Sequence, residues 1–422
     1  MNKTLTDRKS SLVLVLVCFL MYTVLSVTRY AYTSAIAGII NDGIFTKAAA
    51  GTINSSFYIT YGLSQFLGSF YVDKISPFKT ISIALIGTVL ANIAMSVSSS
   101  FAVILIARSF CGLAQFGVWP ALLKVISEYI SPDYRRKSMY FLPIGLQLGV
   151  IISLLLAAVV LKYGNWQDLF TVSYASLAVC TVVFFLTVAI VDKKAVYIEP
   201  EKKEKTAKMT EEKSNISTWR VIISSGAIFV FVVALARSLV SAGFESWIPT
   251  MLMESYNLSP SFSSILTTIT TVANTLAVFV VMALYPKVFK TEYFATGMFF
   301  LMMLPVVVAM VFIGKIALIV AIVSIIFANL FRNAIQQFMA VEIPAGYNKY
   351  NKAGMMAGLI NVFGCIGGAV AGTIFGYTAD NFGWNATILS WAVLVFVGMV
   401  ASFAAIPVWK KFSNTNNDIM KR

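Results

Sequence analysis

The stretch "SLVLVLVCFLMYTVLSVTRYAYTSAIAGII" (residues 11–40) decides the fold. It is almost wholly apolar, and a helix of this length, rising about 1.5 Å per residue, crosses the roughly 30 Å hydrocarbon core of a bilayer. The run is too long for the apolar part of a cleavable signal peptide, and no small-residue cleavage site follows it. We therefore expect the stretch to remain in the mature protein as a transmembrane helix.

The rest of the chain has the same character. Of its 422 residues, 59% are hydrophobic and 12% are charged, with a mean hydropathy of +0.82, whereas a soluble domain has about 25% charged residues. A lipid-facing backbone must satisfy its own hydrogen bonds, and runs this long exceed barrel strands, so helices are expected. The sequence predicts an all-α membrane protein with twelve transmembrane helices. The predicted spans are roughly 11–40, 48–71, 80–97, 101–129, 138–161, 167–191, 221–253, 262–284, 293–313, 316–340, 353–376 and 386–409.

The distribution of Lys and Arg predicts the orientation. If both termini are cytoplasmic, 25 of the 32 Lys and Arg residues lie in inside segments, three in outside loops and four within spans. This asymmetry is a strong positive-inside signal. The formal charge of +14 is then explained by topology and needs no nucleic acid partner. We expect a multi-pass monomer in the lipid bilayer of the cell inner or plasma membrane, with both termini cytoplasmic.

One polar segment, "DKKAVYIEPEKKEKTAKMTEEKSNIS" (192–217), divides the chain into two halves. Its Lys and Glu content favours a disordered cytoplasmic linker between six-helix bundles at 1–191 and 218–422. The halves resemble repeats, since "KYGNWQDLF" precedes the sixth span and "DNFGWNATI" precedes the twelfth. Two pseudo-symmetric bundles with a site near the bilayer midplane form the alternating-access plan of secondary transporters.

Four arginines are the intramembrane cations, Arg29, Arg108, Arg237 and Arg332, and Glu245 is the one carboxylate well inside a predicted span. A charge at the bilayer centre is disfavoured by about 2.5–3.5 kcal/mol on insertion scales, so each requires a cavity, a partner or a route to the interface. The positive surplus is best explained if the missing counter-ion is the substrate. Arg29 and Arg237 occupy matching depths in the first span of each half, which favours a shared role in binding it.

The other two arginines have open alternatives. Arg108 could snorkel to the outer interface or join a structural bond network, and Arg332 could line a cavity or bond to a neighbouring helix. Polar residues recurring at helical spacing favour a hydrated cavity, although hydrogen bonds between helices are the alternative explanation. The stripes are Tyr22, Ser26, Arg29 and Thr33; Asn54, Tyr58, Tyr61 and Gln65; Arg237, Ser241 and Glu245; Thr267, Thr271 and Asn274; and Asn329, Arg332, Asn333 and Gln336.

The loop "GSFYVDKISPFKT" (68–80) follows the second span. Asp73 and Lys79 could form a cytoplasmic latch between helices, and we group Arg108 with them as a gating candidate.

These features resemble the major facilitator superfamily: Gly68, Asp73 and Lys79 after the second span, Arg108 followed by Gly112 in the fourth, and the six-plus-six layout. More narrowly, "CGLAQFGVWP", "TYGLSQFLGSFYVDK", "SWIPTML" and "GYTADNFGWN" resemble the organophosphate:phosphate antiporter family, which includes glycerol-3-phosphate and hexose-phosphate transporters. The resemblance implies that an arginine in the first span and one in the seventh bind the substrate phosphate.

The first of these arginines corresponds to Arg29. Where the family has the second, this chain has Ser241, and Arg237 lies one turn earlier on the same face. The lysines often found beside the first arginine and in the second span are Tyr30 and Gln65 here. The family's histidine in the fifth span falls near Gln147. A site with fewer cations suits a monoanion such as a sugar acid, or a larger organic phosphate.

The leading hypothesis is a secondary transporter of a small organic anion, an organophosphate or sugar phosphate in exchange for phosphate, working by rocker-switch alternating access. The alternative is proton- or cation-coupled symport of a carboxylate such as a sugar acid, with Glu245 as the coupling residue. A transporter-like membrane sensor is a further hypothesis. We expect no enzyme activity, no cofactor and no metal site, since histidine is absent and no catalytic motif is present. The predicted substrate-binding residues are Arg29, Tyr30, Tyr58, Tyr61, Gln65, Gln147, Arg237, Ser241, Asn274, Arg332 and Asn333.

Overall fold

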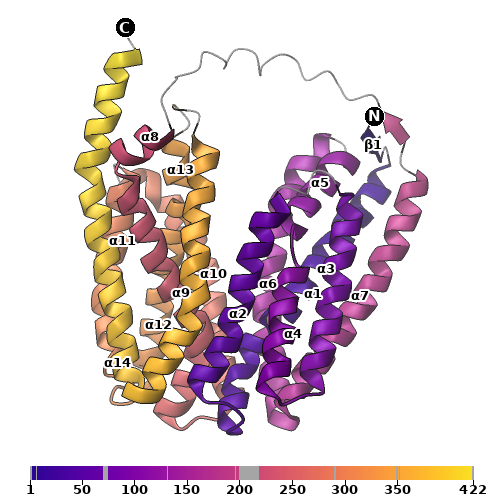
Figure 1. The fold of residues 1–422 in the computed structure, drawn as a ribbon, viewed down its shortest axis with the longest axis horizontal. Helices are drawn as coiled ribbons and strands as arrows, with labels where there is room; N and C mark the ends of the chain where they lie inside the picture. The colour runs from indigo at the N-terminus through magenta and orange to yellow at the C-terminus, as the bar shows by residue number, and fades with distance from the viewer. Residues whose placement is uncertain are drawn as a thin grey trace. The chain divides into compact units, whose positions relative to one another are not determined.

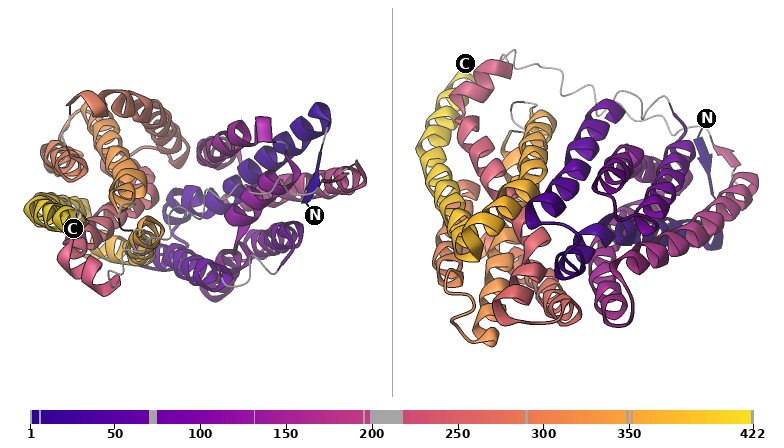
Figure 2. Two further views of the ribbon diagram at one scale, coloured as in Figure 1. Left: turned by 90° about the horizontal axis from the view of Figure 1, so that it is seen from above. Right: turned by 60° about the horizontal axis from the view of Figure 1, so that its bottom comes forward.

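The computed structural model describes residues 2–5, 7–69, 75–130, 132–194, 196–198, 218–288, 291–347, 350 and 352–420. The chain divides into two compact units, which we describe separately. Unit 1 comprises Met1–Glu211 and Ser259–Ile265, and unit 2 comprises Glu212–Leu258 and Leu266–Arg422. Each unit consists of long helices lying side by side, seen along their length in Figure 1 and roughly end-on in Figure 2.

The first six predicted spans are helical in unit 1. Its helices are α1 (Arg8–Asn41), α2 (Lys47–Ser69), α3 (Pro77–Ser96), α4 (Phe101–Ala114), α5 (Val118–Tyr129), α6 (Pro132–Tyr163) and α7 (Trp166–Lys194). The first begins where Asp7 accepts hydrogen bonds from the backbone N–H groups of Lys9 and Ser10, which are two of the donors that a helix N-terminus leaves unpaired.

The predicted span 101–129 is two helices instead of one. The helical hydrogen bonding stops after Ala114, and Gly117 adopts φ +62° before α5 begins. Glycine tolerates this left-handed conformation because it has no Cβ. The break places three residues, 115–117, in a turn inside the membrane span.

The last six predicted spans fall on the helices that follow, which belong to unit 2 except for the start of α10, up to Ile265, which belongs to unit 1. These helices are α8 (Thr218–Ser224), α9 (Ala227–Tyr256), α10 (Pro260–Val288), α11 (Glu292–Met310), α12 (Leu318–Gln337), the π-helix η2 (Phe338–Glu342), α13 (Ile343–Gly346) and α14 (Ala353–Met420). The last of these contains two predicted spans, separated by a kink at Gly383, where φ is +79°. Trp384 follows that kink directly, just as Trp166 begins α7.

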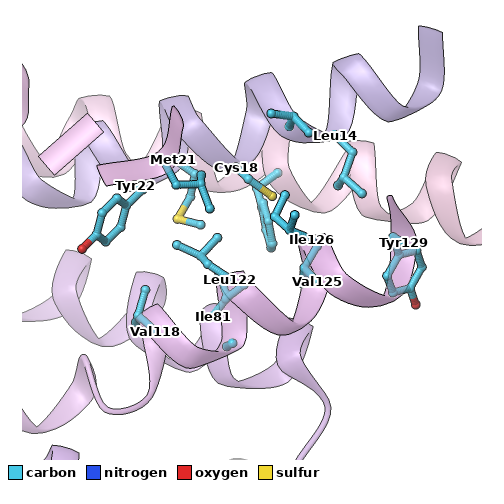
Figure 3. Close-up of a cluster of buried hydrophobic side chains, with 14 of the residues drawn as sticks. Leu14, Cys18, Met21, Tyr22, Ile81, Val118, Leu122, Val125, Ile126 and Tyr129 are labelled. Carbon is cyan, nitrogen blue, oxygen red and sulfur yellow. The ribbon is translucent and has the colours of Figure 1, made fainter. Parts of the chain in front are cut away.

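The core of unit 1 is apolar side chains from helices distant in the sequence. Leu14, Cys18 and Met21 on α1 face Leu122 and Ile126 on α5 (Figure 3). These side chains are almost entirely buried. Their burial reflects close packing of α1 against α5, the helix that follows the break at 115–117.

A short sheet lies at the start of the chain. The strand β1 (Asn2–Thr4) pairs in antiparallel register with β2 (Val196–Ile198), so that Asn2 lies opposite Ile198. The segment 192–217, predicted to be a disordered linker, begins with regular structure: its first residues continue α7, and Val196–Ile198 form β2. Residues 199–217 lie outside the described residues.

The predicted fold class is confirmed. In the part of the chain that the structure describes, nine stretches are long and apolar enough to cross a membrane, and one of them, Ala353–Phe412, runs for 60 residues and holds two predicted spans. Within the described residues, each of the twelve predicted spans falls on one or two helices, and the small sheet is the exception to an all-α architecture.

Candidate functional site: intramembrane arginines in each unit

Arg29 lies in the middle of α1 with a half-buried side chain. Its Nε donates a 2.7 Å hydrogen bond to Oε1 of Gln115, and its guanidinium carbon lies 4.9 Å from the centre of the Tyr61 ring. Within the described residues, no carboxylate forms an ion pair with Arg29, and its two terminal nitrogens make no hydrogen bond. The charge of Arg29 is therefore held in place but not neutralised.

Arg108, on α4, is 1% exposed and connects α1 with α2. Its Nη1 donates to the main-chain oxygen of Arg29 at 2.8 Å, and its Nη2 donates to Oδ1 of Asn54 at 3.2 Å. Its guanidinium lies over the rings of Phe57 and Tyr32, 4.3 Å and 5.3 Å from their centres. Of the alternatives for Arg108, the structure shows the bond network, and no snorkelling route is needed.

Close approach of α4 to α2 makes this network possible. A Cβ added to Gly112, one turn after Arg108, would meet the Phe57 carbonyl oxygen at 2.6 Å and the Tyr61 nitrogen at 3.0 Å. Only a residue without a side chain allows two helix backbones to come so near each other. Gly112 therefore sets the distance across which Arg108 reaches Asn54.

The remaining predicted residues of unit 1 are less tightly placed. Tyr30 and Tyr58 are half-buried, and the Nε2 of half-buried Gln65 is buried without a hydrogen-bond partner among the described residues. Gln147, on α6, is exposed. Lys79 is also exposed, in the first turn of α3, while Asp73 lies outside the described residues, so the latch stays a prediction.

Unit 2 brings four of the predicted residues together. Arg332, on α12, donates from Nη1 to Oε1 of Glu245 at 2.9 Å and to Oγ of Ser241 at 2.5 Å. Ser241 in turn donates to Glu245 at 3.2 Å and accepts from Nη2 of Arg237 at 3.3 Å. The Nε of Arg237 is buried and has no hydrogen-bond partner among the described residues. Glu245 thus neutralises Arg332, and the group of two cations and one anion keeps one positive charge.

The same scaffold bond occurs in both units. In unit 1 the arginine of the fourth span donates to the main-chain oxygen of Arg29, and in unit 2 Arg332 donates at 3.3 Å to the main-chain oxygen of Ser241. By this bond Ser241 is the counterpart of Arg29, and Arg237 lies one turn earlier. The displacement of the second arginine noted in the sequence is therefore present in the structure.

Two further predicted residues lie on the helices of unit 2. Asn333 follows Arg332 on α12 and is half-buried. Asn274 lies on α10, and its side chain is outside the described part.

Sequence reasoning missed Gln115 as a site residue. It lies two helical turns beyond Arg108, in the turn that separates α4 from α5, and its side chain is fully buried. A polar residue two positions before a glycine, Gly117, within a membrane span is the signal that could have found it. Its partner Arg29 is 86 positions away in sequence, and helical spacing cannot reveal such a pairing.

These features describe a multi-pass membrane protein with guanidinium groups inside its apolar helices. A family model described as Major Facilitator Superfamily matches residues 14–372, and the chain belongs to this superfamily. This superfamily is one of membrane transporters and not of enzymes.

Individual relatives are distant. The chain is 21% identical over 262 residues to the chloroplastic ascorbate transporter of Arabidopsis thaliana, covering 56% of this chain and 45% of the relative. It is 21% identical over 265 residues to the chloroplastic sodium-dependent phosphate transport protein 1 of Arabidopsis thaliana, covering 55% and 48%. The chain thus spans less than half the length of these curated relatives.

A solved structure shares the fold. The inward-facing, occupied crystal structure of a bacterial homolog of the human lysosomal transporter Spinster superposes with a TM-score of 0.78, covering 94% of this chain and 97% of that one at 14% identity. At this identity the likeness concerns the fold alone.

Proposed function

We propose that this chain transports a small organic anion and that Arg29 binds the anionic group. The observation that carries the proposal is the state of Arg29, whose Nε is held by an amide while no carboxylate among the described residues neutralises its charge. An ionised guanidinium inside a membrane span is disfavoured unless a counter-charge or hydrogen-bond acceptors stabilise it. Its two terminal nitrogens form a fork that matches a carboxylate or a phosphate with two parallel hydrogen bonds.

In unit 2 the corresponding role falls to Arg237. Arg332 has its counter-charge in Glu245, 2.9 Å away, whereas among the described residues Arg237 donates its hydrogen bond to the neutral hydroxyl of Ser241. An anion bound to Arg237 would neutralise the one positive charge that remains after Glu245 has paired with Arg332. The predicted ligands Tyr61 and Ser241 adjoin these two arginines and supply hydroxyl groups.

More finely, we propose an organophosphate in exchange for phosphate, by alternating access. Exchange suits a chain without histidine in which the one described carboxylate deep in a span is already ion-paired, because such a site offers few proton carriers. The relative named as a sodium-dependent phosphate transport protein adds support for phosphate as a substrate.

The second candidate is cation-coupled symport of a carboxylate such as a sugar acid. The observation in its favour is that the Glu245 side chain is 35% exposed while it pairs with a guanidinium that is 9% exposed. A carboxylate with this access to water can meet a coupling cation, and binding that cation would release Arg332. The relative named as an ascorbate transporter points in the same direction.

The test is counterflow in proteoliposomes loaded with phosphate, glycerol 3-phosphate, gluconate or ascorbate, for wild type, Arg29→Ala and Arg29→Lys. Lys162→Ala, which removes an exposed positive charge elsewhere in unit 1, is the matched control. We expect the Arg29→Ala rate to fall at least tenfold, Arg29→Lys to retain part of it, and the control to match wild type. Full exchange by Arg29→Ala contradicts the proposal.

We also propose that the chain is a monomer in the cell inner or plasma membrane with both termini cytoplasmic. The placement of 25 Lys and Arg residues in inside segments against three outside supports this orientation. Protease accessibility of terminal tags in right-side-out vesicles tests it.

A further inference from the structure

Gln115 occupies a place that the chain creates by interrupting a membrane helix. The last residue of α4 is Ala114, and Gly117, in the left-handed region, precedes α5. In the turn between them Gln115 is fully buried, although an amide in hydrocarbon is costly unless both of its polar atoms are bonded. A continuous helix would present this residue in a different direction.

Both ends of the Gln115 amide have partners, and these partners fix its orientation. Arginine can only donate, so the amide oxygen must face Nε of Arg29, at 2.7 Å. The amide nitrogen then points to Oγ1 of Thr88 on α3, at 3.2 Å, and to Sγ of Cys111, at 3.5 Å. Thr88 is itself fully buried. The guanidinium of Arg29 is thereby aimed by a rigid group bonded to three helices.

The hydrogen-bond partner of Arg29 is an amide, although the carboxylate of a glutamate, which has the same length, would fit in its place. The chain does use a carboxylate for Arg332, whose charge Glu245 neutralises at 2.9 Å. It uses main-chain and amide oxygens for Arg108 and an amide oxygen for Arg29. Glutamate at 115 would accept the same hydrogen bond but would also supply the negative charge that we assign to the transported anion.

We propose that Gln115 is a positioning residue that orients Arg29 while leaving its charge available to the transported anion. The inference rests on the proposed function. Because an amide does not titrate, it also keeps anion binding at Arg29 independent of proton binding at this position. A glutamate there would make the affinity for the anion depend on pH.

The other titratable groups around Arg29 do not interfere with this test. They are Tyr22 and Tyr30 on α1, Tyr61 on α2 and Cys111 on α4, with Arg108 bonded to the Arg29 carbonyl, while α3 contributes the non-titrating Thr88. Phenols and thiols lose their protons above neutral pH, and arginine stays charged. A glutamate at 115 would be the one group of this set able to change charge between pH 5 and 7.5.

The experiment measures phosphate self-exchange in proteoliposomes for wild type, Gln115→Glu and Gln115→Met at pH 5.5 and 7.5. Comparing each variant's KM with that of wild type at the same pH cancels the ionisation of phosphate itself. Gln115→Glu should raise KM by about 10- to 100-fold at pH 7.5, where the ionised glutamate neutralises Arg29, and less at a pH low enough to protonate it. Gln115→Met, which removes the bond without adding charge, should raise KM by a smaller factor that is equal at both pH values.

Gln167→Glu is the matched control, since it makes the same chemical change on an exposed amide of α7. Size-exclusion profiles in detergent report whether each variant folds, and Gln115→Met decides the question if Gln115→Glu does not. If wild type carries phosphate and both Gln115 variants keep its KM at both pH values, the inference is overturned and the proposed function stands. If wild type carries neither phosphate nor gluconate, the proposed function itself fails.

Discussion

Replacing Glu245 by glutamine tests the charge balance of unit 2. Glu245 Oε1 lies 2.9 Å from Nη1 of Arg332 and 3.2 Å from Oγ of Ser241, and Nη2 of Arg237 lies 3.3 Å from the same hydroxyl. Glutamine keeps the length and an acceptor oxygen but removes the charge. The group then changes from two cations and one anion to two cations with no anion.

The expected gain in anion affinity follows from these distances. The two hydrogen bonds through Ser241 Oγ place Arg237 Nη2 and Glu245 Oε1 at most 6.5 Å apart (3.3 + 3.2). An anion bonded to Arg237 therefore lies on the order of 8 Å from Glu245. The repulsion at that distance is about 0.5 kcal/mol in water and about 2 kcal/mol at an effective dielectric constant near 20. Glu245→Gln should lower KM for phosphate between about 2- and 30-fold.

The same substitution should lower stability slightly. Arg332 keeps its bonds to Ser241 and loses a counter-charge whose side chain is 35% exposed, so solvent screens part of the interaction. We expect a loss of about 1–2 kcal/mol, visible as a lower unfolding temperature in detergent.

Phosphate self-exchange and pH-gradient-driven accumulation of gluconate, measured side by side, distinguish the two candidate functions. Glu254→Gln is the matched control, because it removes a carboxylate on the same helix that bonds to Trp384 instead of to an arginine. If Glu245→Gln leaves the phosphate KM unchanged, the electrostatic reasoning is refuted. If the variant also loses accumulation driven by a proton gradient, Glu245 is a coupling group and the symport proposal replaces exchange.

Three further substitutions test the scaffold of unit 1. Arg108→Lys should reduce the free energy of unfolding by about 2–4 kcal/mol and raise KM, because an ammonium cannot reach both the Arg29 carbonyl and Asn54. Thermal unfolding measures the first effect, and transport kinetics measure the second. Gly112→Ala should lower the free energy of unfolding by about 1–3 kcal/mol, because the added methyl group pushes α4 away from α2. A crosslink between the two helices should then form more slowly. Gly117→Ala should lower the free energy of unfolding by about 1–2 kcal/mol, because alanine is strained in the left-handed backbone conformation of Gly117. An unchanged unfolding temperature would contradict this prediction.

Hydrophobic length alone predicted where the chain crosses the membrane, because lipid forces every spanning segment to be a helix. The same rule does not locate interruptions within a span. The break at 115–117 and the kink at Gly383 depend on single glycines whose positive φ has no signature in hydropathy. The pairing of Asn2–Thr4 with Val196–Ile198 was equally hidden, since both segments are short and their partners are distant in sequence.

Helical spacing predicted one shared face of α9 but not what its residues bond to. It grouped Arg237, Ser241 and Glu245 correctly on one face of α9, where Ser241 bonds to both of the others. It could not show that Glu245 belongs to Arg332, which lies on another helix. Pairing Arg29 with Arg237 by depth also overlooked that the bond to the fourth-span arginine makes Ser241 the counterpart of Arg29.

That shared bond separates what the two units keep from what they change. In each unit a buried arginine of the fourth span holds the backbone of the first span, so this bond belongs to the scaffold and is independent of the substrate. The side chains around this bond differ in charge. In unit 1 the partner of Arg29 is a neutral amide, whereas in unit 2 a serine takes the corresponding position and a carboxylate neutralises one of the two arginines. Under the proposed function, two units built alike but charged differently should bind an anion unequally. Arg29→Ala should consequently impair transport more than Arg237→Ala, and equal losses would show that the local charge balance does not control binding.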